Sequence, residues 1–183
     1  MRIFGIDPGS RRTGYGCIER QGSRHTLVVC GTLSGPAQAT FPEKLKAIHA
    51  GLTALLAQHR PECVAIEDIF HHRQAQNPGS ALRLGEARGV ALLAAAEAGV
   101  PVVTYPPATV KLAVVGYGRA EKQQVQQMIK LLLGLDAPPS PHDVADALAV
   151  ALCHLQSSTG TVAQLHASRS RTGTPRSWRD YIP

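Results

Sequence analysis

Hydrophobic residues fall in short runs at the start of the chain and in helical stripes farther on. The first three runs, residues 2–7, 14–19 and 26–32, are joined by short turns. Short connections between strands predict an antiparallel meander. Between residues 42 and 58 the apolar positions change to helical spacing, which predicts an amphipathic helix with its stripe at Leu45, Ile48, Leu52, Leu55 and Leu56.

Strand and helix patterns alternate in the rest of the apolar chain. We expect strands at residues 63–67 and 102–105, with helices at 80–98, 120–133 and 142–156. Such alternation predicts parallel strands flanked by helices. The sequence therefore predicts one α/β domain over residues 1–156, with a five-stranded mixed sheet of three antiparallel strands followed by two parallel ones. Residues 157–183 change to Ser, Thr, Gly and Arg, and we expect a basic, flexible tail.

Acidic residues stand at the ends of two apolar runs and on the last predicted helix. Asp7 follows an apolar run and precedes Pro8-Gly9, and Glu67 ends a second such run. Asp143 and Asp146 are three residues apart, so they share one helix face. Four carboxylates without Cys or His at ligand spacing are typical of sites for hard cations such as magnesium or manganese.

Each acid also has a simpler structural interpretation. Asp7 fits an Asx turn before Pro-Gly, and Glu67 fits a surface charge at a strand end. Asp143 fits the first turn of a helix with Ser140 as N-cap. For Asp146 this kind of interpretation is weakest, because an acid among Ala, Val and Leu is unfavourable unless it is paired or bound to a metal. Taken together and in this order, the four acids favour a shared metal site.

Charge and cysteine content narrow the class of protein. The formal net charge is +6, which favours polyanionic partners only modestly. The four cysteines are scattered without a Cys-x-x-Cys pair, as in a reduced cytosolic protein. Because the sequence shows neither a signal peptide nor an apolar run of 18 residues, we expect a cytoplasmic protein with no membrane segment.

Two lysines and a polar loop supply candidate nucleic-acid contacts. Two divalent ions held by carboxylates can promote the hydrolysis of a phosphodiester. Lys111 and Lys122 would then neutralise the charge of the phosphate. The simpler alternative is that each lysine is an ordinary solvated surface charge. Phe70 stands at the root of the polar stretch 71–79, where its ring could stack on an unpaired base or simply cap the core. Arg73 and Asn77 in that stretch are further candidate DNA contacts.

The element order, with acids on the first and fourth strands and on the last helix, resembles the ribonuclease H-like fold. Five segments in order also resemble the RuvC family of Holliday junction resolvases, over residues 1–156. These segments are DPGSRRTGYG from Asp7, IEDIF ending at Phe70, ALRLGEARGVA from Ala81, VKLAVVGYGRAEKQQV from Val110 and HDVADALAVALCH from His142.

The resemblance implies a metal-dependent endodeoxyribonuclease that acts in homologous recombination and DNA repair. It implies a homodimer that binds four-way junction DNA, makes paired symmetric nicks, and cooperates with the RuvA and RuvB branch-migration proteins. Two Mg²⁺ ions per subunit are implied, with Mn²⁺ as a substitute. By this resemblance, the family's metal ligands fall on Asp7, Glu67, Asp143 and Asp146. Its stacking aromatic falls on Phe70, and its phosphate contacts fall on Lys111 and Lys122. The candidate catalytic residues are therefore the four acids and Lys122.

Three other classes of protein remain as alternatives. An actin-like or sugar-kinase ATPase needs a duplicated domain, for which this chain is too short. A shorter resolvase-like relative is disfavoured by the Phe70 loop and by the segment from Lys111 to Lys122. A junction-binding module without catalysis is distinguished from a nuclease by a cleavage assay with and without magnesium.

Overall fold

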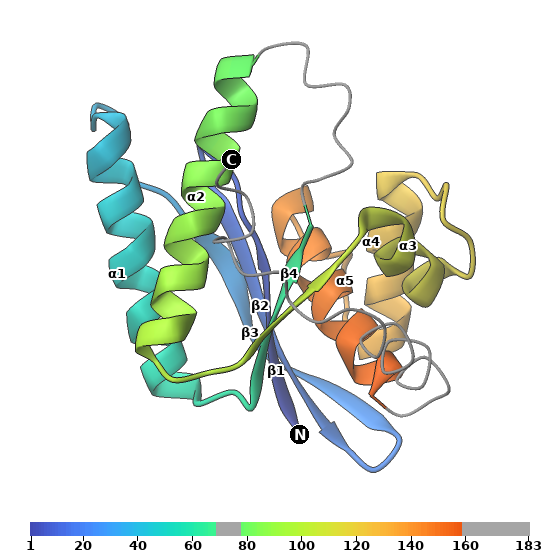
Figure 1. The fold of residues 1–183 in the computed structure, drawn as a ribbon. Coiled ribbons are helices and arrows are strands. Elements are labelled where there is room, and N and C mark those ends of the chain that lie inside the picture. The colour runs from blue at the N-terminus through green and yellow to red at the C-terminus, as the bar shows by residue number, and fades with distance from the viewer. Residues whose placement is uncertain (69–77, 159–183) are drawn as a thin grey trace, which may run out of the picture.

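A five-stranded mixed sheet forms the centre of the molecule. The computed structural model describes residues 1–68 and 78–158. Its strand order is β3-β2-β1-β4-β5, with antiparallel pairing among the first three strands and parallel pairing of β4 to β1 and β5 (Figure 1). The strands are β1 (Arg2–Asp7), β2 (Thr13–Gln21), β3 (Arg24–Leu33), β4 (Cys63–Glu67) and β5 (Val102–Tyr105). The predicted sheet is confirmed.

Helices cover both faces of this sheet. In Figure 1, α1 (Phe41–His59) and α2 (Pro78–Glu97) lie on one face, and α3 (Pro107–Val115), α4 (Lys122–Leu133) and α5 (His142–Ser157) lie on the other. Each side has its own apolar cluster, centred on residues such as Phe4 and Leu52 on the α1 side and Ile3 and Leu148 on the α5 side. Such two-sided coverage explains why β1 and β4 are apolar along almost their whole length.

Two glycines let α5 lie unusually close to the sheet. A Cβ atom added at Gly5 would overlap the carbonyl oxygen of Ala147, and one added at Gly14 would overlap the carbonyl oxygen of Asp143. Any side chain at these positions would therefore push α5 away from β1 and β2. The close approach brings the first turn of α5 against the carboxyl end of β1.

Some predicted boundaries differ from the structure. The short helix α3 was not predicted, because it begins at Pro107 and is apolar without a polar stripe. Helix α5 begins at His142 with Pro141 as its N-cap and no side-chain cap, so the prediction of Ser140 as N-cap is wrong. Helix α4 begins at Lys122, two residues later than predicted, because Glu121 caps it in a capping box with Gln124.

Two further predictions concern the thiols and the chain end. All four cysteines are free, and three of them, Cys17, Cys63 and Cys153, are buried. Within the residues described, no helix has the length and apolar character needed to cross a membrane. The predicted tail beyond residue 158 lies outside the described residues, and the boundary after residue 156 stays a prediction.

Candidate metal centre

Asp7 and Glu67 leave the sheet side by side. They are the last residues of β1 and β4, which are adjacent and parallel, with Ile6 paired to Ile66 directly before them. The carboxyl ends of parallel strands form one edge of a sheet, and ligands commonly bind there in α/β proteins. The local pattern of apolar strand followed by an acid therefore delivers two carboxylates to one place.

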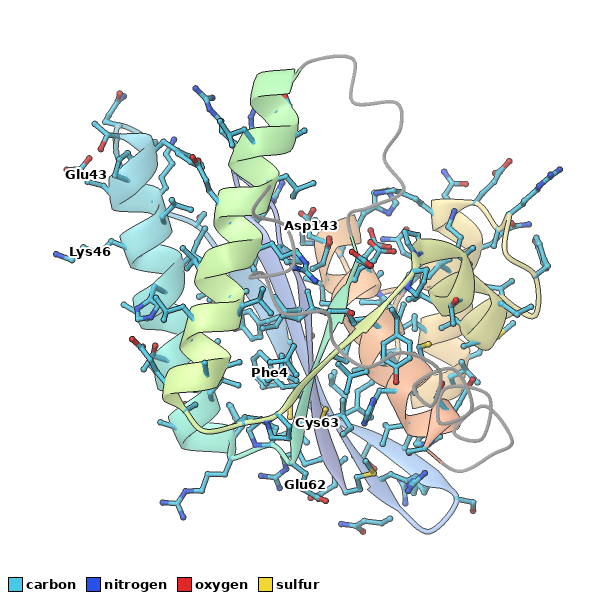
Figure 2. The ribbon with its side chains drawn as sticks, viewed as in Figure 1. Phe4, Glu43, Lys46, Glu62, Cys63 and Asp143 are labelled. Atoms are coloured by element: carbon cyan, nitrogen blue, oxygen red, sulfur yellow. The ribbon has the colours of Figure 1, made fainter. Side chains whose placement is uncertain are left out.

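Helix α5 adds two more carboxylates to this edge. Asp143 and Asp146 lie in its first turns, and Figure 2 labels Asp143 near one end of α5. A cavity of about 300 Å³ is lined by Asp7, Glu67, Asp143 and Asp146 together. The structure thus brings together all four acids that the sequence singled out. The cavity is completed by Pro8, Gly9, Leu84, Pro107, Val110, Lys111, Lys122, Val125 and Ala149.

The acids strongly perturb one another. Burial, together with the negative charges of Asp146, Glu67 and Asp143, raises the pKa of Asp7 from 3.8 to about 8, and Lys122 opposes this shift. Burial and Asp146 raise the pKa of Glu67 from 4.5 to about 7, against the effect of Lys122 and Lys111. Both shifts have the same cause, since negative charge is concentrated where water is largely excluded. The four carboxylates of this cluster therefore outnumber the cationic side chains that neutralise them.

Two cationic side chains partly neutralise the cluster. Lys122 Nζ lies 3.3 Å from Asp146 Oδ2, and this carboxylate is the main cause of the raised pKa of Lys122. Arg12 Nε lies 3.0 Å from Asp143 Oδ2. Arg12 lies in the turn between β1 and β2, and its contact with Asp143 was not predicted from the sequence. The only signal in the sequence was its place five residues after Asp7 in the same turn.

The donor set suits a divalent cation. All four groups offer carboxylate oxygens, the ligands that Mg²⁺ and Mn²⁺ prefer. A divalent cation would also relieve the repulsion that raises the pKa of Asp7 and Glu67. Across residues 1–68 and 78–158, however, no three His, Cys, Asp or Glu side chains stand ready to hold a metal ion. One oxygen of Asp143 instead contacts Arg12 and one oxygen of Asp146 contacts Lys122, so a bound ion would compete with these cations for the two carboxylates.

Comparison with known proteins identifies the family to which the chain belongs. The family described as crossover junction endodeoxyribonuclease RuvC matches residues 3–154. The chain belongs to this family. The RuvC protein of Heliobacterium modesticaldum is 52% identical over 163 residues, which cover 89% of this chain and 99% of that protein. The RuvC protein of Citrifermentans bemidjiense is 53% identical over 158 residues, covering 86% of this chain and 94% of that protein.

Solved RuvC structures share the fold. The structure of Thermus thermophilus RuvC matches with a TM-score of 0.76 and 38% identity, covering 86% of this chain and 95% of that one. A second structure, the same protein in complex with a Holliday junction substrate, matches with a TM-score of 0.77 and 36% identity over the same shares. These matches and the strand order confirm the predicted ribonuclease H-like class.

The RuvC-family residues predicted from the sequence divide into two groups. Lys111 and Lys122 line the same cavity as the acids, on the side formed by α3 and α4. Phe70, Arg73 and Asn77 fall outside the described residues, together with most of the predicted polar loop. The metal-binding and DNA-binding roles of all these residues stay predictions.

Proposed function

We propose that this chain is a structure-selective endonuclease that resolves four-way DNA junctions by paired symmetric nicks in homologous recombination and DNA repair. The observation that carries the proposal is the cavity in which four carboxylates and two lysines meet in a chain of the RuvC family. The T. thermophilus relative, which shares the fold and 36% identity, is described in complex with a Holliday junction substrate.

Asp7, Glu67, Asp143 and Asp146 would hold the metal, which we propose to be two Mg²⁺ ions per subunit with Mn²⁺ able to substitute. Bound divalent ions of this kind supply the positive charge that stabilises a phosphate under attack and its leaving oxygen. Because burial and the neighbouring carboxylates raise the pKa of Asp7 to about 8, Asp7 would have to give up its proton to hold a cation at neutral pH. Metal binding is therefore expected to release protons and to strengthen as the pH rises.

Lys122 and Lys111 hold the substrate phosphate in this proposal. Lys122, which pairs with Asp146 in this structure, would contact a nonbridging phosphate oxygen once Asp146 holds the metal, and Lys111 of α3 lines the same cavity. Apolar side chains of Leu84, Val110 and Val125 line the same cavity and limit the access of bulk water. Low local polarity strengthens the attraction between lysine and phosphate.

In this proposal the chain forms a homodimer, and each subunit makes one of the two nicks. Two active sites related by a two-fold axis match a pair of symmetric nicks. We place the contact on the outer face of α2, where Leu82 and Leu93 are 66% and 51% exposed and a side chain added at Gly85 or Gly89 would meet open space. The inner face of this helix, with Ala87, Ala91, Ala94 and Ala95, is already buried in the chain.

The remaining proposals follow the family resemblance. Phe70 would stack on an unpaired base at the opened crossover, and Arg73 and Asn77 would contact DNA from the loop that follows it. RuvA and RuvB would be the partner proteins, and the cytoplasm would be the place of action.

The test is cleavage of a synthetic four-way junction with labelled arms, with magnesium and with EDTA. We expect nicks in two opposed strands near the crossover that require the metal, and no nicks in a linear duplex of the same sequence. Junction binding without any cleavage in Mg²⁺ or Mn²⁺ would refute the nuclease and favour a non-catalytic junction-binding module.

A further inference from the structure

A second cavity, of about 350 Å³, lies next to the metal centre. It opens between the turn that follows β1 and the first turns of α1 and α2, and it contains no acidic lining residue among those described. We call it the basic pocket, and its lining residues are Ser10, Arg11, Phe41, Lys44, Ser80 and Arg83.

The charge of the basic pocket is not balanced by neighbouring acids. Three of its six lining residues are cationic, and within residues 1–68 and 78–158 none of Arg11, Lys44 and Arg83 forms an ion pair. Glu43, the carboxylate next to Lys44 in the sequence, accepts hydrogen bonds of 2.7 Å from the Thr40 backbone N–H and hydroxyl. Glu43 is thereby committed to capping α1. An unbalanced cluster of three cations and two hydroxyls is suited to an anion.

The cationic side chains are held in place by their neighbours. The Arg83 guanidinium carbon lies 5.5 Å from the centroid of the Phe41 ring, a cation–π contact that orients the group across the gap between α2 and α1. Lys44 packs its aliphatic stem against Gly35, where an added Cβ would come within 2.6 Å of the Lys44 Cγ. The N-terminal turns of two helices, each with the positive end of its dipole, add to the potential.

The basic pocket and the metal centre share a wall. Pro8 and Gly9 line the metal centre, and the next two residues, Ser10 and Arg11, line the basic pocket. Helix α2 divides in the same way, with Leu84 on one side and Arg83 on the other. Thr13 braces the turn between the cavities, because its hydroxyl donates to the Gly9 carbonyl oxygen at 3.4 Å. A DNA strand carries a phosphate at every nucleotide, so a strand with one phosphate at the acids presents another to the adjoining cavity.

We propose that the basic pocket binds a backbone phosphate of the DNA strand that is cut, next to the scissile phosphate, and so sets the register of that strand over the four acids. This inference rests on the nuclease function proposed above. Arg11 and Lys44 supply charge, Arg83 supplies a guanidinium fork, and Ser10 and Ser80 supply hydroxyl donors. The pocket reads no base, so its contribution is independent of DNA sequence.

The test compares charge-neutral variants at the pocket with a matched variant on α1 that lies outside the pocket. Lys44→Gln and Arg83→Gln are compared with Lys46→Gln, since Lys46 is an exposed side chain of α1 that points away from the sheet (Figure 2). Binding to a synthetic four-way junction is measured by fluorescence anisotropy at several salt concentrations, each variant carrying Asp146→Asn to prevent cleavage. We expect each pocket variant to bind about tenfold more weakly at moderate salt. The double variant should lower the slope of log K against log salt by about 1.

Lys46→Gln should leave both quantities nearly unchanged. Phe41→Leu should weaken binding when Arg83 is present and have no further effect in the Arg83→Gln background, because the ring acts by orienting Arg83. Equal losses in Lys44→Gln, Arg83→Gln and Lys46→Gln, or no loss in any of them, would overturn the proposal.

The same measurements separate this proposal from the proposed function. If the unaltered chain cleaves junctions while the pocket variants bind like Lys46→Gln, the pocket proposal fails and the nuclease stands. If the unaltered chain binds DNA without cleaving it and the pocket variants still bind more weakly than Lys46→Gln, the nuclease and the proposed register over a scissile phosphate both fail, and only phosphate binding by the pocket stands.

Discussion

Lys122 at the start of α4 and Asp146 on α5 form an ion pair of 3.3 Å in the cavity lined by the four acids. The pair joins a proposed metal ligand to a proposed phosphate contact, so in the metal-free protein each group satisfies the other. A divalent cation would take the place of the ammonium group, and Lys122 would become available to the substrate. The competition between internal cations and metal ions for the same carboxylates leads to several measurable expectations.

Asp146→Asn should abolish nicking while junction binding stays nearly intact. The amide is a weaker ligand for a hard cation, and binding to DNA depends mainly on basic contacts. A loss of cleavage on the order of 100-fold or more is expected at saturating magnesium. Asp136→Asn, an exposed residue after α4, is the matched control and should cleave normally. A near-normal rate in Asp146→Asn would show that the site assignment is wrong.

Asp7→Asn should stabilise the metal-free protein at high pH. The folded state raises the pKa of Asp7 from 3.8 to about 8, so between these pH values it binds a proton that the unfolded chain releases. Asp7 therefore lowers the free energy of unfolding progressively from about pH 4 to about pH 8 and remains unfavourable above that. Thermal unfolding in EDTA at pH 5, 7 and 9 should show an advantage of Asp7→Asn that grows with pH.

In the presence of magnesium, the unaltered chain should be more stable than Asp7→Asn. A ligand that binds only the folded state stabilises it by an amount that grows with the logarithm of its concentration over Kd, and the loss of one carboxylate weakens the affinity. The unaltered chain should gain more from added Mg²⁺ than Asp7→Asn does. An equal gain in both proteins would place the metal away from Asp7.

Arg12→Gln should modestly strengthen metal binding. The Arg12 guanidinium lies 3.0 Å from Asp143 Oδ2 and would compete with a cation for this carboxylate. A half-exposed ion pair contributes about 0 to 1 kcal/mol, so a gain in Mg²⁺ affinity of up to about fivefold is expected. Isothermal titration of the DNA-free protein measures the affinity directly, with Arg24→Gln in the β2–β3 hairpin as control. A weaker affinity in Arg12→Gln would mean that Arg12 supports the metal centre.

Negative charge introduced on the outer face of α2 should dissociate the dimer into monomers. Leu82 and Leu93 are 66% and 51% exposed, and glutamates at both positions would place four negative charges in the proposed contact. Analytical ultracentrifugation at micromolar concentration should find a dimer for the unaltered chain and a monomer for the double variant. Leu131→Glu on α4, where the leucine is 70% exposed, is the control and should remain dimeric. A fully active monomer would contradict the dimer proposal.

The sequence alone was sufficient for the elements that carry the acids. Asp7 and Glu67 could be located because an apolar strand that ends at a polar residue is a local pattern, governed by residues adjacent in the chain. Asp143 and Asp146 could be paired because their spacing makes them neighbours on any α-helix. The mixed sheet also followed from local signals, since short turns and helical crossovers lead to different strand directions.

Only the tertiary structure decided which distant side chains meet. The contact of Arg12 with Asp143 depends on how closely α5 approaches the sheet, and that distance is set by the missing side chains of Gly5 and Gly14. The basic pocket likewise combines Arg11 with Arg83, residues from different elements far apart in the chain. Apolar and polar spacing determines what each segment becomes, because it acts between residues close in the sequence. The partners of a charged side chain depend on packing angles and distances between elements, which only the assembled core determines.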